Sequence, residues 1–113
     1  MRILKLSAKG RLEVKNIKNE LRVLQNEVGG YIEPVTIFDD KDIVILADEE
    51  GKLKRRSANP FIPGLVGDVI ICGVKGEEFC SLSISKTYKL ARLFGGKQTG
   101  NKMLDLSTDI SSH

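Results

Sequence analysis

Four basic side chains crowd one short stretch of the chain, at Lys52, Lys54, Arg55 and Arg56. Ammonium and guanidinium groups bind phosphates and carboxylates through charge-assisted hydrogen bonds, so this stretch could hold an anionic ligand or an acidic partner. Four like charges so close together repel one another, which favours a functional explanation over a purely structural one. The alternative is a solvated hairpin and loop whose basic side chains hold no ligand.

Residues on both sides of this run could complete a binding site. Gly30 follows Gly29, and a Gly-Gly pair lets a ligand approach the backbone closely because no Cβ blocks it. Tyr31 offers a ring and a hydroxyl, and Phe61 offers a second ring that could stack on a base. Asn59 precedes a proline, which holds it extended, so its amide could face a ligand. The expected ligand-binding or partner-binding set is Gly30, Tyr31, Glu33, Lys52, Lys54, Arg55, Arg56, Asn59 and Phe61.

Two members of this set have a plain structural alternative. Glu33 interrupts an apolar strand, and it could simply lie on the outward face of an alternating edge strand. Asn59 could cap its own turn instead of presenting its amide to a ligand.

A second basic surface is predicted on the last helix, at Lys86, Lys89 and Arg92. Such a helix could bind DNA or RNA, although the net charge of +3 is low for that role. Tyr88 is the one aromatic residue among these basic residues, and we expect it in the core. The surface is therefore a secondary candidate.

The sequence carries no recognisable catalytic, metal or cofactor signature. Its one histidine is the last residue, His113, and Cys72 and Cys80 lack both a CxxC spacing and an evident base. We expect both cysteines to be reduced core residues of a cytosolic protein, the alternative being a bridge across a hairpin. No GxxxxGK[ST] or GxGxxG motif is present. We therefore expect no catalytic residue, no metal site and no cofactor.

The elements that must position these residues predict an α+β fold. Residues 1–94 suit a single domain, and residues 95–113 are polar and predict a flexible tail. We expect a small mixed or antiparallel sheet of five to seven strands, with strand patterns at residues 2–6, 11–15, 31–38, 43–47, 52–54, 68–74 and 79–82. Pro34 donates no backbone hydrogen bond, so its strand should lie at an edge of the sheet or carry a bulge.

Two helices should pack on this sheet. The first is predicted over about residues 17–28, capped by Asn16 or Asn19 and ended by Gly29, with one buried face formed by Ile17, Leu21, Leu24 and Val28. The second is predicted over about residues 84–94, capped by Ser83 or Ser85, with its buried face formed by Ile84, Tyr88 and Ala91, and with Leu90 and Phe94 near it.

Between the elements, residues 55–67 form a long connection that holds several apolar residues expected to be exposed, among them Phe61, Ile62, Leu65 and Val66. Loops of this length in a small domain are more often functional than incidental. The longest apolar run, residues 43–47, is far shorter than the ~20 residues of a membrane span. Residues 1–20 lack the apolar core of a signal peptide, so we expect a cytoplasmic protein with no membrane partner.

Several short motifs occur in a recognisable order. Residues 1–4 read Met-Arg-Ile-Leu, residues 28–33 Val-Gly-Gly-Tyr-Ile-Glu and residues 48–53 Asp-Glu-Glu-Gly-Lys-Leu. An Asp-Val-Ile-Ile-Cys-Gly strand at residues 68–73 and a Gly-Glu-Glu-Phe-Cys-Ser-Leu segment at residues 76–82 follow. This series resembles the small phage and mobile-element family catalogued as domain of unknown function 3846, over roughly residues 1–93.

One part of the chain departs from that family's pattern. Arg55, Arg56 and Ser57 stand where members have Leu-Pro, and Pro60 stands where an Arg is expected. The resemblance implies a host-takeover or element-maintenance setting in a bacterial host, and no catalytic residues.

Three functions are compatible with these observations. The first is a non-catalytic phage or mobile-element protein that inhibits a host defence protein by binding it. The second is a small-molecule binder that sequesters an anionic nucleotide signal. The third is a nucleic-acid-binding accessory protein, and an enzyme with an unrecognised site is a further alternative. A homo-oligomer is compatible with each of them.

Overall fold

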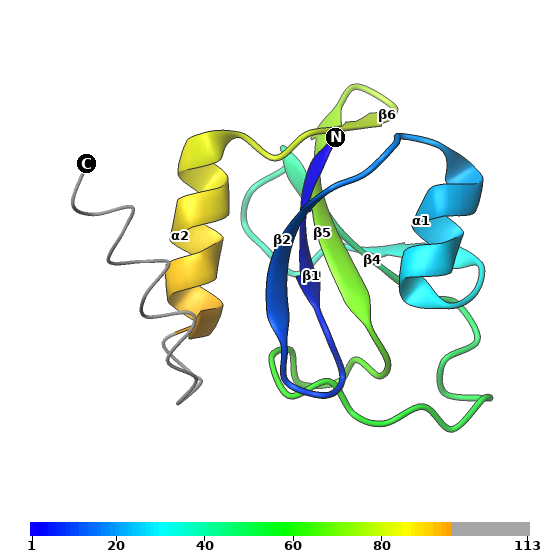
Figure 1. Cartoon of the computed structure of the whole chain (residues 1–113). Helices are drawn as coiled ribbons and strands as arrows, with labels where there is room; N and C mark the ends of the chain where they lie inside the picture. Colours follow the sequence, from blue (N-terminus) through cyan, green and yellow to red (C-terminus); the bar gives the residue numbers. More distant parts are fainter. Residues whose placement is uncertain (96–113) are drawn as a thin grey trace.

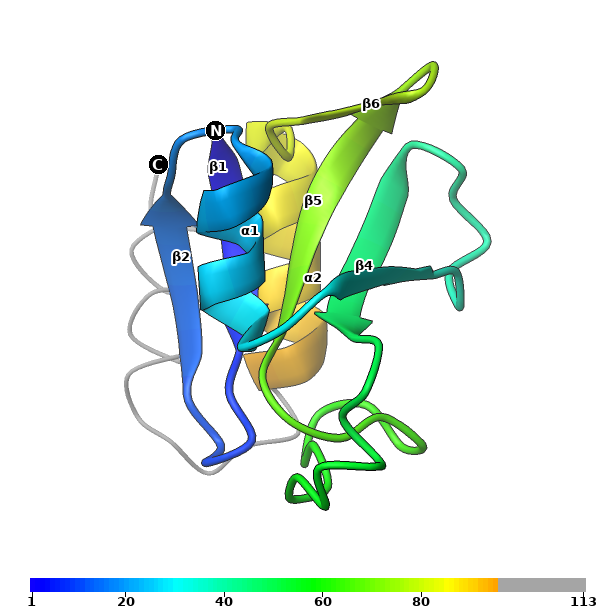
Figure 2. The same cartoon turned by 90° about the vertical axis from the view of Figure 1, so that its right-hand side faces the viewer.

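The computed structural model describes residues 1–95, which form an antiparallel sheet between two helices (Figures 1 and 2). This is the predicted α+β fold. The strands are β1 (Arg2–Leu6), β2 (Leu12–Asn16), β3 (Ile32–Val35), β4 (Ile43–Asp48), β5 (Val69–Lys75) and β6 (Glu78–Cys80), and the helices are α1 (Leu21–Val28) and α2 (Ile84–Gly95).

The six strands run in the order β2-β1-β5-β4-β3, and β6 pairs with the end of β5. Strands β4 and β5 lie in the middle, and all six residues of β4 are buried because helices and loops cover both of its faces. Among the described residues, strand β3 pairs with β4 alone and ends the sheet, as Pro34 predicts. The edge position suits a residue that cannot donate to a neighbouring strand.

Each face of the sheet has its own apolar core. On one face, α1 contributes Leu24 and Val28, which pack against Val44, Ile70 and Cys72 of the central strands. On the other face, α2 and the loop after β4 cover the strand residues that alternate with those of the first face. These side chains include Leu4, Leu6, Ile43, Ile45, Val69 and Ile71. The alternation follows from the two-residue period of a strand.

Helix α1 begins later than predicted. The backbone N–H of Ile17 donates to the carbonyl of Met1, which extends the β1–β2 ladder and keeps residue 17 out of a helix. Leu21 therefore opens the helix and is 59% exposed, while Leu24 and Val28 are buried as predicted. The expected asparagine cap is also wrong. Asn19 donates to the carbonyl of Phe79, Asn16 accepts from the terminal amino group, and the cap residue is Glu20 without a side-chain bond.

Helix α2 buries Ala91 as predicted, with Leu90 and Phe94 beside it, but the buried face is rotated away from Ile84 and Tyr88. Thr87, Leu90, Ala91 and Phe94 are buried, whereas Ile84 is 58% and Tyr88 37% exposed. The buried set follows the i, i+3, i+4, i+7 spacing, so the correct face lies one position before the predicted one. Ser83 caps the helix as predicted, since its Oγ accepts from the N–H of Lys86 and its carbonyl from Thr87.

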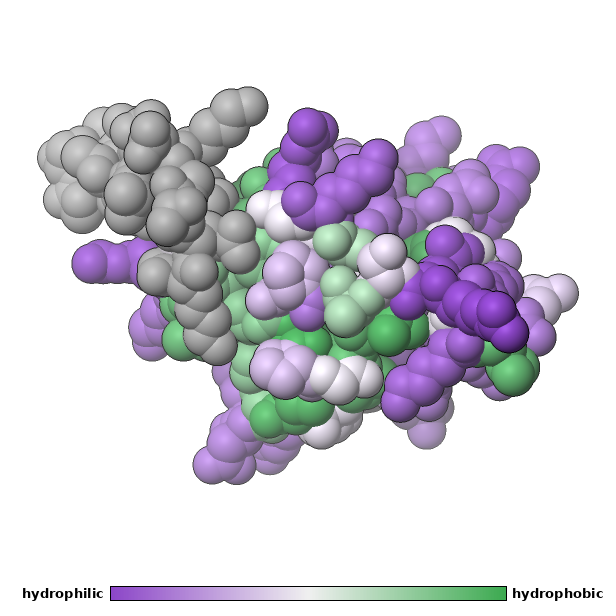
Figure 3. Space-filling model, turned by 90° about the horizontal axis from the view of Figure 1, so that it is seen from below, coloured by the Kyte–Doolittle hydropathy of each residue, from purple (hydrophilic) through white to green (hydrophobic). Residues whose placement is uncertain are grey.

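The segment between β4 and β5 differs most from expectation. Residues 52–54 form a turn, not a strand, and Phe61 and Ile62 are buried against α2 instead of being exposed. The ring of Phe61 meets that of Phe94 edge to face at 6.3 Å. The molecule seen from below is apolar in its central part and hydrophilic around it (Figure 3).

The remaining predictions have simple outcomes. Both Cys72 and Cys80 are free, as expected. Gly95 belongs to α2, so the predicted tail of residues 95–113 falls outside the described residues except for its first position. No helix within residues 1–95 is long and apolar enough to cross a membrane.

Candidate functional site

Asp48, the last residue of β4, organises the basic stretch that follows it. Its side chain is 0% exposed, and its Oδ2 accepts hydrogen bonds from Lys54 Nζ at 3.0 Å and Arg56 Nε at 2.8 Å. Its Oδ1 accepts from the backbone N–H of Glu50 at 2.9 Å. These three residues form what we call the Asp48 cluster: Asp48, Lys54 and Arg56.

The electrostatics of this cluster keep Asp48 ionised. Burial raises the pKa of the Asp48 carboxyl, but the Glu50 N–H and the Lys54 and Arg56 side chains outweigh it, so the pKa lies below its ordinary value. A buried carboxylate needs such partners, because an unpaired charge away from water is costly. The positive charges of Lys54 and Arg56 therefore serve the fold, which corrects, for these two of the four residues, the expectation that folding alone could not explain the basic run.

The Gly29-Gly30 pair fits closely over the same cluster. Gly29 ends α1 in a left-handed conformation with φ of 83°, and its carbonyl accepts from Arg56 Nη2 at 2.8 Å and Lys54 Nζ at 3.4 Å. A Cβ added to Gly30 would lie 2.5 Å from Asp48 Oδ1 and 2.6 Å from Lys54 Nζ. Gly30 is therefore a packing residue of the cluster, and the predicted close approach is made by the chain's own side chains.

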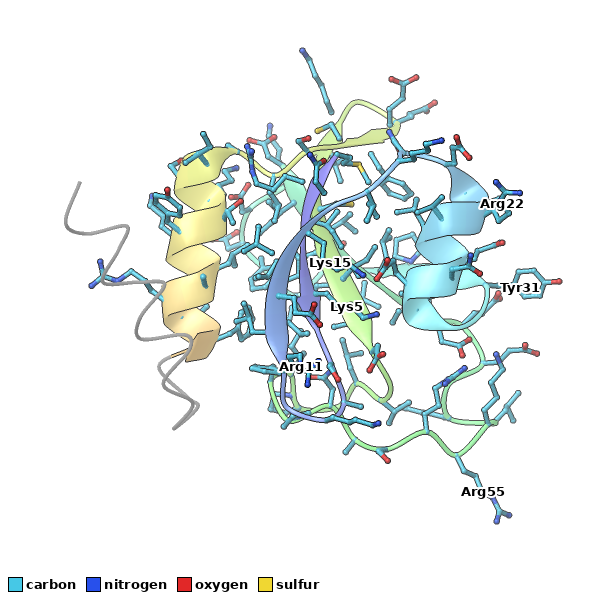
Figure 4. The ribbon with its side chains drawn as sticks, viewed as in Figure 1. Lys5, Arg11, Lys15, Arg22, Tyr31 and Arg55 are labelled. Atoms are coloured by element: carbon cyan, nitrogen blue, oxygen red, sulfur yellow. The ribbon has the colours of Figure 1, made fainter. Side chains whose placement is uncertain are left out.

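An exposed surface lies beside the cluster, and we call it the Tyr31–Arg55 surface: Tyr31, Lys52, Leu53 and Arg55. Tyr31 is 64% and Leu53 83% exposed, and both basic side chains are exposed as well. The labelled side chains of Tyr31 and Arg55 point away from the body of the molecule (Figure 4). Arg55 has a φ of 55°, the left-handed conformation that non-glycine residues adopt rarely. The turn thus projects its side chains outward at some conformational cost.

Two shallow pockets adjoin this surface and divide the predicted site. One, of about 360 Å³, is lined by Gly30, Tyr31 and Lys54 together with Gln25, Asn26, Gly29 and Glu50. The other, of about 410 Å³, is lined by Glu33, Lys52 and Leu53 together with Val35, Ala47, Asp48, Glu49, Gly64, Leu65 and Val66. The turn of residues 52–56 contributes to both. Glu33 is exposed on β3, at the outward position that both its structural alternative and its predicted role require.

Asn59 and Phe61 do not belong to an accessible site. Asn59 is 4% exposed, and its amide nitrogen donates to the carbonyls of Leu6 at 3.0 Å and Gly67 at 2.9 Å. Its Oδ1 accepts from the backbone N–H groups of Phe61 and Ile62. Phe61 is 1% exposed, so neither its ring nor the saturated amide can meet a ligand. Asn59 holds its own loop together, which was the structural alternative.

The second basic surface is also partly neutralised. Lys86 Nζ lies 2.8 Å from Asp40 Oδ2 and 3.4 Å from Asp42 Oδ2. The hydrogen bond to Asp40 raises the pKa of Lys86, and the same bond lowers the pKa of Asp40. Lys89 and Arg92 are exposed on the same helix. A nucleic acid would therefore meet two exposed cations here, which is fewer than the sequence suggests.

The chemistry available to the described residues is limited. Burial, with a smaller contribution from Cys80, raises the pKa of the Cys72 thiol to about 12, so this thiol stays protonated at neutral pH. Among residues 1–95, no group of three or more His, Cys, Asp or Glu side chains could hold a metal ion.

Sequence reasoning missed two residues of this region. Leu53 was assigned to a strand, although a leucine between two lysines in a turn is a signal of an exposed apolar contact. Asp48 was not among the predicted site residues, although it directly follows a wholly apolar strand. A polar residue that continues such a strand is a candidate for burial.

A family model described as Domain of unknown function (DUF3846) matches residues 1–95, which are the described part of the chain. No curated protein and no solved structure matches the chain.

Proposed function

The chain belongs to the DUF3846 family, and we propose that it is a non-catalytic binding protein whose partner is another protein. The observation that carries this proposal is the Tyr31–Arg55 surface, where an aromatic ring, a leucine and an arginine on the two segments joined by the Asp48 cluster are all exposed. Tyrosine and arginine are among the residues that contribute most to protein–protein binding. Leu53 is 83% exposed, so its burial by a partner would make the free energy of binding more favourable.

The Asp48 cluster supports the proposal because it makes the surface rigid. Lys54 and Arg56 link the turn to the carbonyl of Gly29 and to the buried end of β4. Tyr31 comes directly after the anchored Gly29-Gly30 pair. Leu53 and Arg55 are the sequence neighbours of Lys54, which is bound to Asp48. A surface that is already ordered loses less conformational entropy on binding than a mobile loop would.

An anionic nucleotide fits the region less well. Two of the four predicted phosphate-binding cations are paired with Asp48, and the pocket beside Tyr31 contains Glu50 and the end of α1. The C-terminal end of a helix carries partial negative charge, which disfavours a phosphate. The nucleic-acid alternative depends on Lys89 and Arg92, because Lys86 is paired with two aspartates.

The biological setting extends this proposal. The motifs resemble those of phage and mobile-element proteins, so the partner we propose is a protein in the cytoplasm of a bacterial host. A small non-catalytic chain acts on such a target by covering part of its surface. We propose inhibition of a host defence protein as the outcome of that binding.

A matched pair of triple variants tests the proposal. The first changes Tyr31, Leu53 and Arg55 to Ser, and the control changes Tyr88, Leu93 and Arg92 to Ser. Both remove one exposed tyrosine, one exposed leucine and one exposed arginine. Circular dichroism melting curves establish that both variants fold.

Each tagged protein is purified from host cells. Native mass spectrometry then gives the mass of the intact complex, and denaturing mass spectrometry gives the masses of its separate components. We expect the wild-type chain and the control to carry a protein partner in defined stoichiometry, and the Tyr31–Arg55 variant to lose it. Loss of the partner by the control alone, or a bound nucleotide in place of a protein, would contradict the proposal.

A further inference from the structure

The two edges of the sheet are not equivalent. Strand β3 ends one side, and the bond from Glu49 N–H to the Tyr31 carbonyl fixes which of its residues face β4. Because bonded pairs alternate along the ladder, the backbone groups of Ile32 and Pro34 point away from β4, toward the open edge. Pro34 has no N–H to offer, so the edge cannot continue the sheet regularly.

Strand β2 ends the other side and lacks such protection (Figure 2). Ser7 N–H donates to the carbonyl of Arg11, and Ile17 N–H donates to the carbonyl of Met1. Because bonded pairs alternate along an antiparallel ladder, the odd-numbered residues of β2 face β1. The N–H and C=O groups of the even-numbered residues therefore point outward, at Leu12, Val14 and Asn16.

This open edge is regular and accessible. Its five residues contain neither glycine nor proline, and Val14 is 41% exposed. Within residues 1–95, no strand other than β1 pairs with β2. Such an edge is a template for another strand.

We propose that the outer edge of β2 pairs with β2 of a second copy of this chain, antiparallel about a two-fold axis at Val14. In this register Val14 faces its own counterpart, Leu12 faces Asn16, and the three outward residues of each copy exchange six backbone hydrogen bonds. The result is one continuous sheet that contains the strands of both copies. Because the axis is perpendicular to the sheet, the two α2 helices lie on one face and the two α1 helices on the other.

The charges of β2 select this partner. Glu13 and Lys15 flank Val14, so the two-fold axis places each Glu13 opposite the Lys15 of the other copy. These are the closely spaced positions between hydrogen-bonded pairs, where opposite charges stabilise and like charges destabilise pairing. Both side chains project on the α1 face, as Lys15 shows by its contact with Glu27 Oε2 at 2.9 Å. That contact also orders the lysine before pairing (Figure 4).

A parallel or shifted register would lose this match. Shifting by two residues places the two Glu13 side chains or the two Lys15 side chains opposite each other. One other register pairs opposite charges, Glu13 with Arg11, but it is centred on Leu12 and aligns only that residue of the two β2 strands. The register centred on Val14 therefore combines charge complementarity with full overlap of β2, and a second copy supplies it without any other partner. The Tyr31–Arg55 surfaces would lie toward the two far ends of the combined sheet and could bind two partner molecules.

Cysteine cross-linking tests the register in the full-length chain. Cys80 is first changed to Ser, because it is half-buried and could react, and Val14→Cys or Asn16→Cys is then introduced. The two Val14 Cα atoms would lie about 5.5 Å apart, within the range of a disulfide. The two Asn16 Cα atoms would be offset by four residues, or roughly 13 Å. Under mild oxidation we expect Val14→Cys to form a covalent dimer and the Asn16→Cys control to remain uncross-linked.

Sedimentation equilibrium tests the association itself. We expect the wild-type chain to dimerise reversibly at micromolar concentrations, and Val14→Pro to weaken the dimer at least ~10-fold by removing two of the hydrogen bonds. The N–H of Val14 faces away from β1, so this change leaves the β1–β2 ladder intact. Glu13→Lys, which places like charges opposite each other, should also weaken the dimer, and adding Lys15→Glu should restore part of the association.

Three results would overturn the proposal. One is a wild-type chain that stays monomeric up to ~1 mM. Another is a dimer unaffected by both Val14→Pro and Glu13→Lys. The third is cross-linking of Asn16→Cys in preference to Val14→Cys, which would show a different register. A folded Glu13→Lys protein keeps the test valid if Val14→Pro fails to fold.

Discussion

The two basic stretches of this chain look alike in sequence and differ in structure. In the turn after β4, Lys54 and Arg56 are bonded to Asp48, whose side chain is 0% exposed. At the start of α2, Lys86 is bonded to Asp40 and Asp42, whose side chains are 36% and 66% exposed. The first set of charges is held to a buried acid, whereas the second lies at the surface.

The difference shows that the acidic partner decides what a run of cations does. A buried carboxylate makes its cations part of the fold, because removing them leaves an unpaired charge in the interior. An exposed carboxylate is solvated with or without its lysine, so that pairing contributes little. The comparison therefore predicts large effects of substitution at Asp48 and small ones at Lys86.

The largest expected effect is that of Asp48→Ala. The change leaves Lys54 and Arg56 without their acceptor and frees the N–H of Glu50. We expect a loss of about 2–3 kcal/mol in the free energy of unfolding, below the usual value for a buried pair because both cations can turn toward water. Urea denaturation measures it, with Asp42→Ala as the matched control from the exposed set. Equal losses in the two variants would contradict the comparison.

Gly30→Ala should have the next largest effect. The new Cβ would come within 2.6 Å of two atoms of the Asp48 cluster, so the cluster must shift. We expect a loss of about 1–2 kcal/mol, as for other overpacked sites. The double variant Asp48→Ala/Gly30→Ala identifies the cause, because the glycine requirement should weaken once the carboxylate is gone. Strict additivity of the two losses would show that Gly30 is needed for another reason.

Acid sensitivity should separate the two regions further. The folded pKa of Asp48 is lowered, so its contribution to stability is present above the unfolded pKa of about 3.8 and disappears as the pH falls through the folded pKa. We expect the difference in stability between the wild-type chain and Asp48→Asn to be constant from pH 7 to 5 and to shrink below pH 4. Urea denaturation at several pH values measures this difference. A difference that persists unchanged at pH 2 would mean that the carboxylate charge is not what stabilises the cluster.

The sequence predicted the sheet better than it predicted the site. Strand β4 is a continuous apolar run and Pro34 marks an edge, and both signals are local. The start of α1 was wrong because the apolar period continues through Ile17, whose bond to Met1 is made across the β1–β2 ladder. Local periodicity carries no information about such a bond.

Only part of the site was predicted, because contacts between distant parts of the chain again decided which residues are exposed. Tyr31 and Arg55 are exposed as a surface site requires, but Asn59 and Phe61 are buried by contacts with β1 and α2. The pairing of Asp48 with Lys54 and Arg56 depends on the turn of residues 49–55, of which residues 52–54 were predicted as a strand. Charge counting could find the basic residues and could not show which of them were already bound.

The smallest expected effect is that of Lys86→Ala, which tests the prediction that a lysine paired with exposed acids contributes little to stability. The side chain of Lys86 is 29% exposed, and its aspartate partners remain solvated when it is removed. Its pKa is raised, so its contribution is lost only as the pH rises through that folded pKa, well above neutrality. We therefore expect the melting temperature at pH 7 to change by less than about 1 °C, with calorimetry as the measurement and Lys89→Ala on the same helix as the control. A decrease for Lys86→Ala as large as that for Asp48→Ala would mean that the contact between α2 and the β3–β4 connection is structural. Exposure of the acid would then no longer decide which cations serve the fold, and of the three basic residues predicted on α2 only Lys89 and Arg92 would remain as surface charges available to a partner.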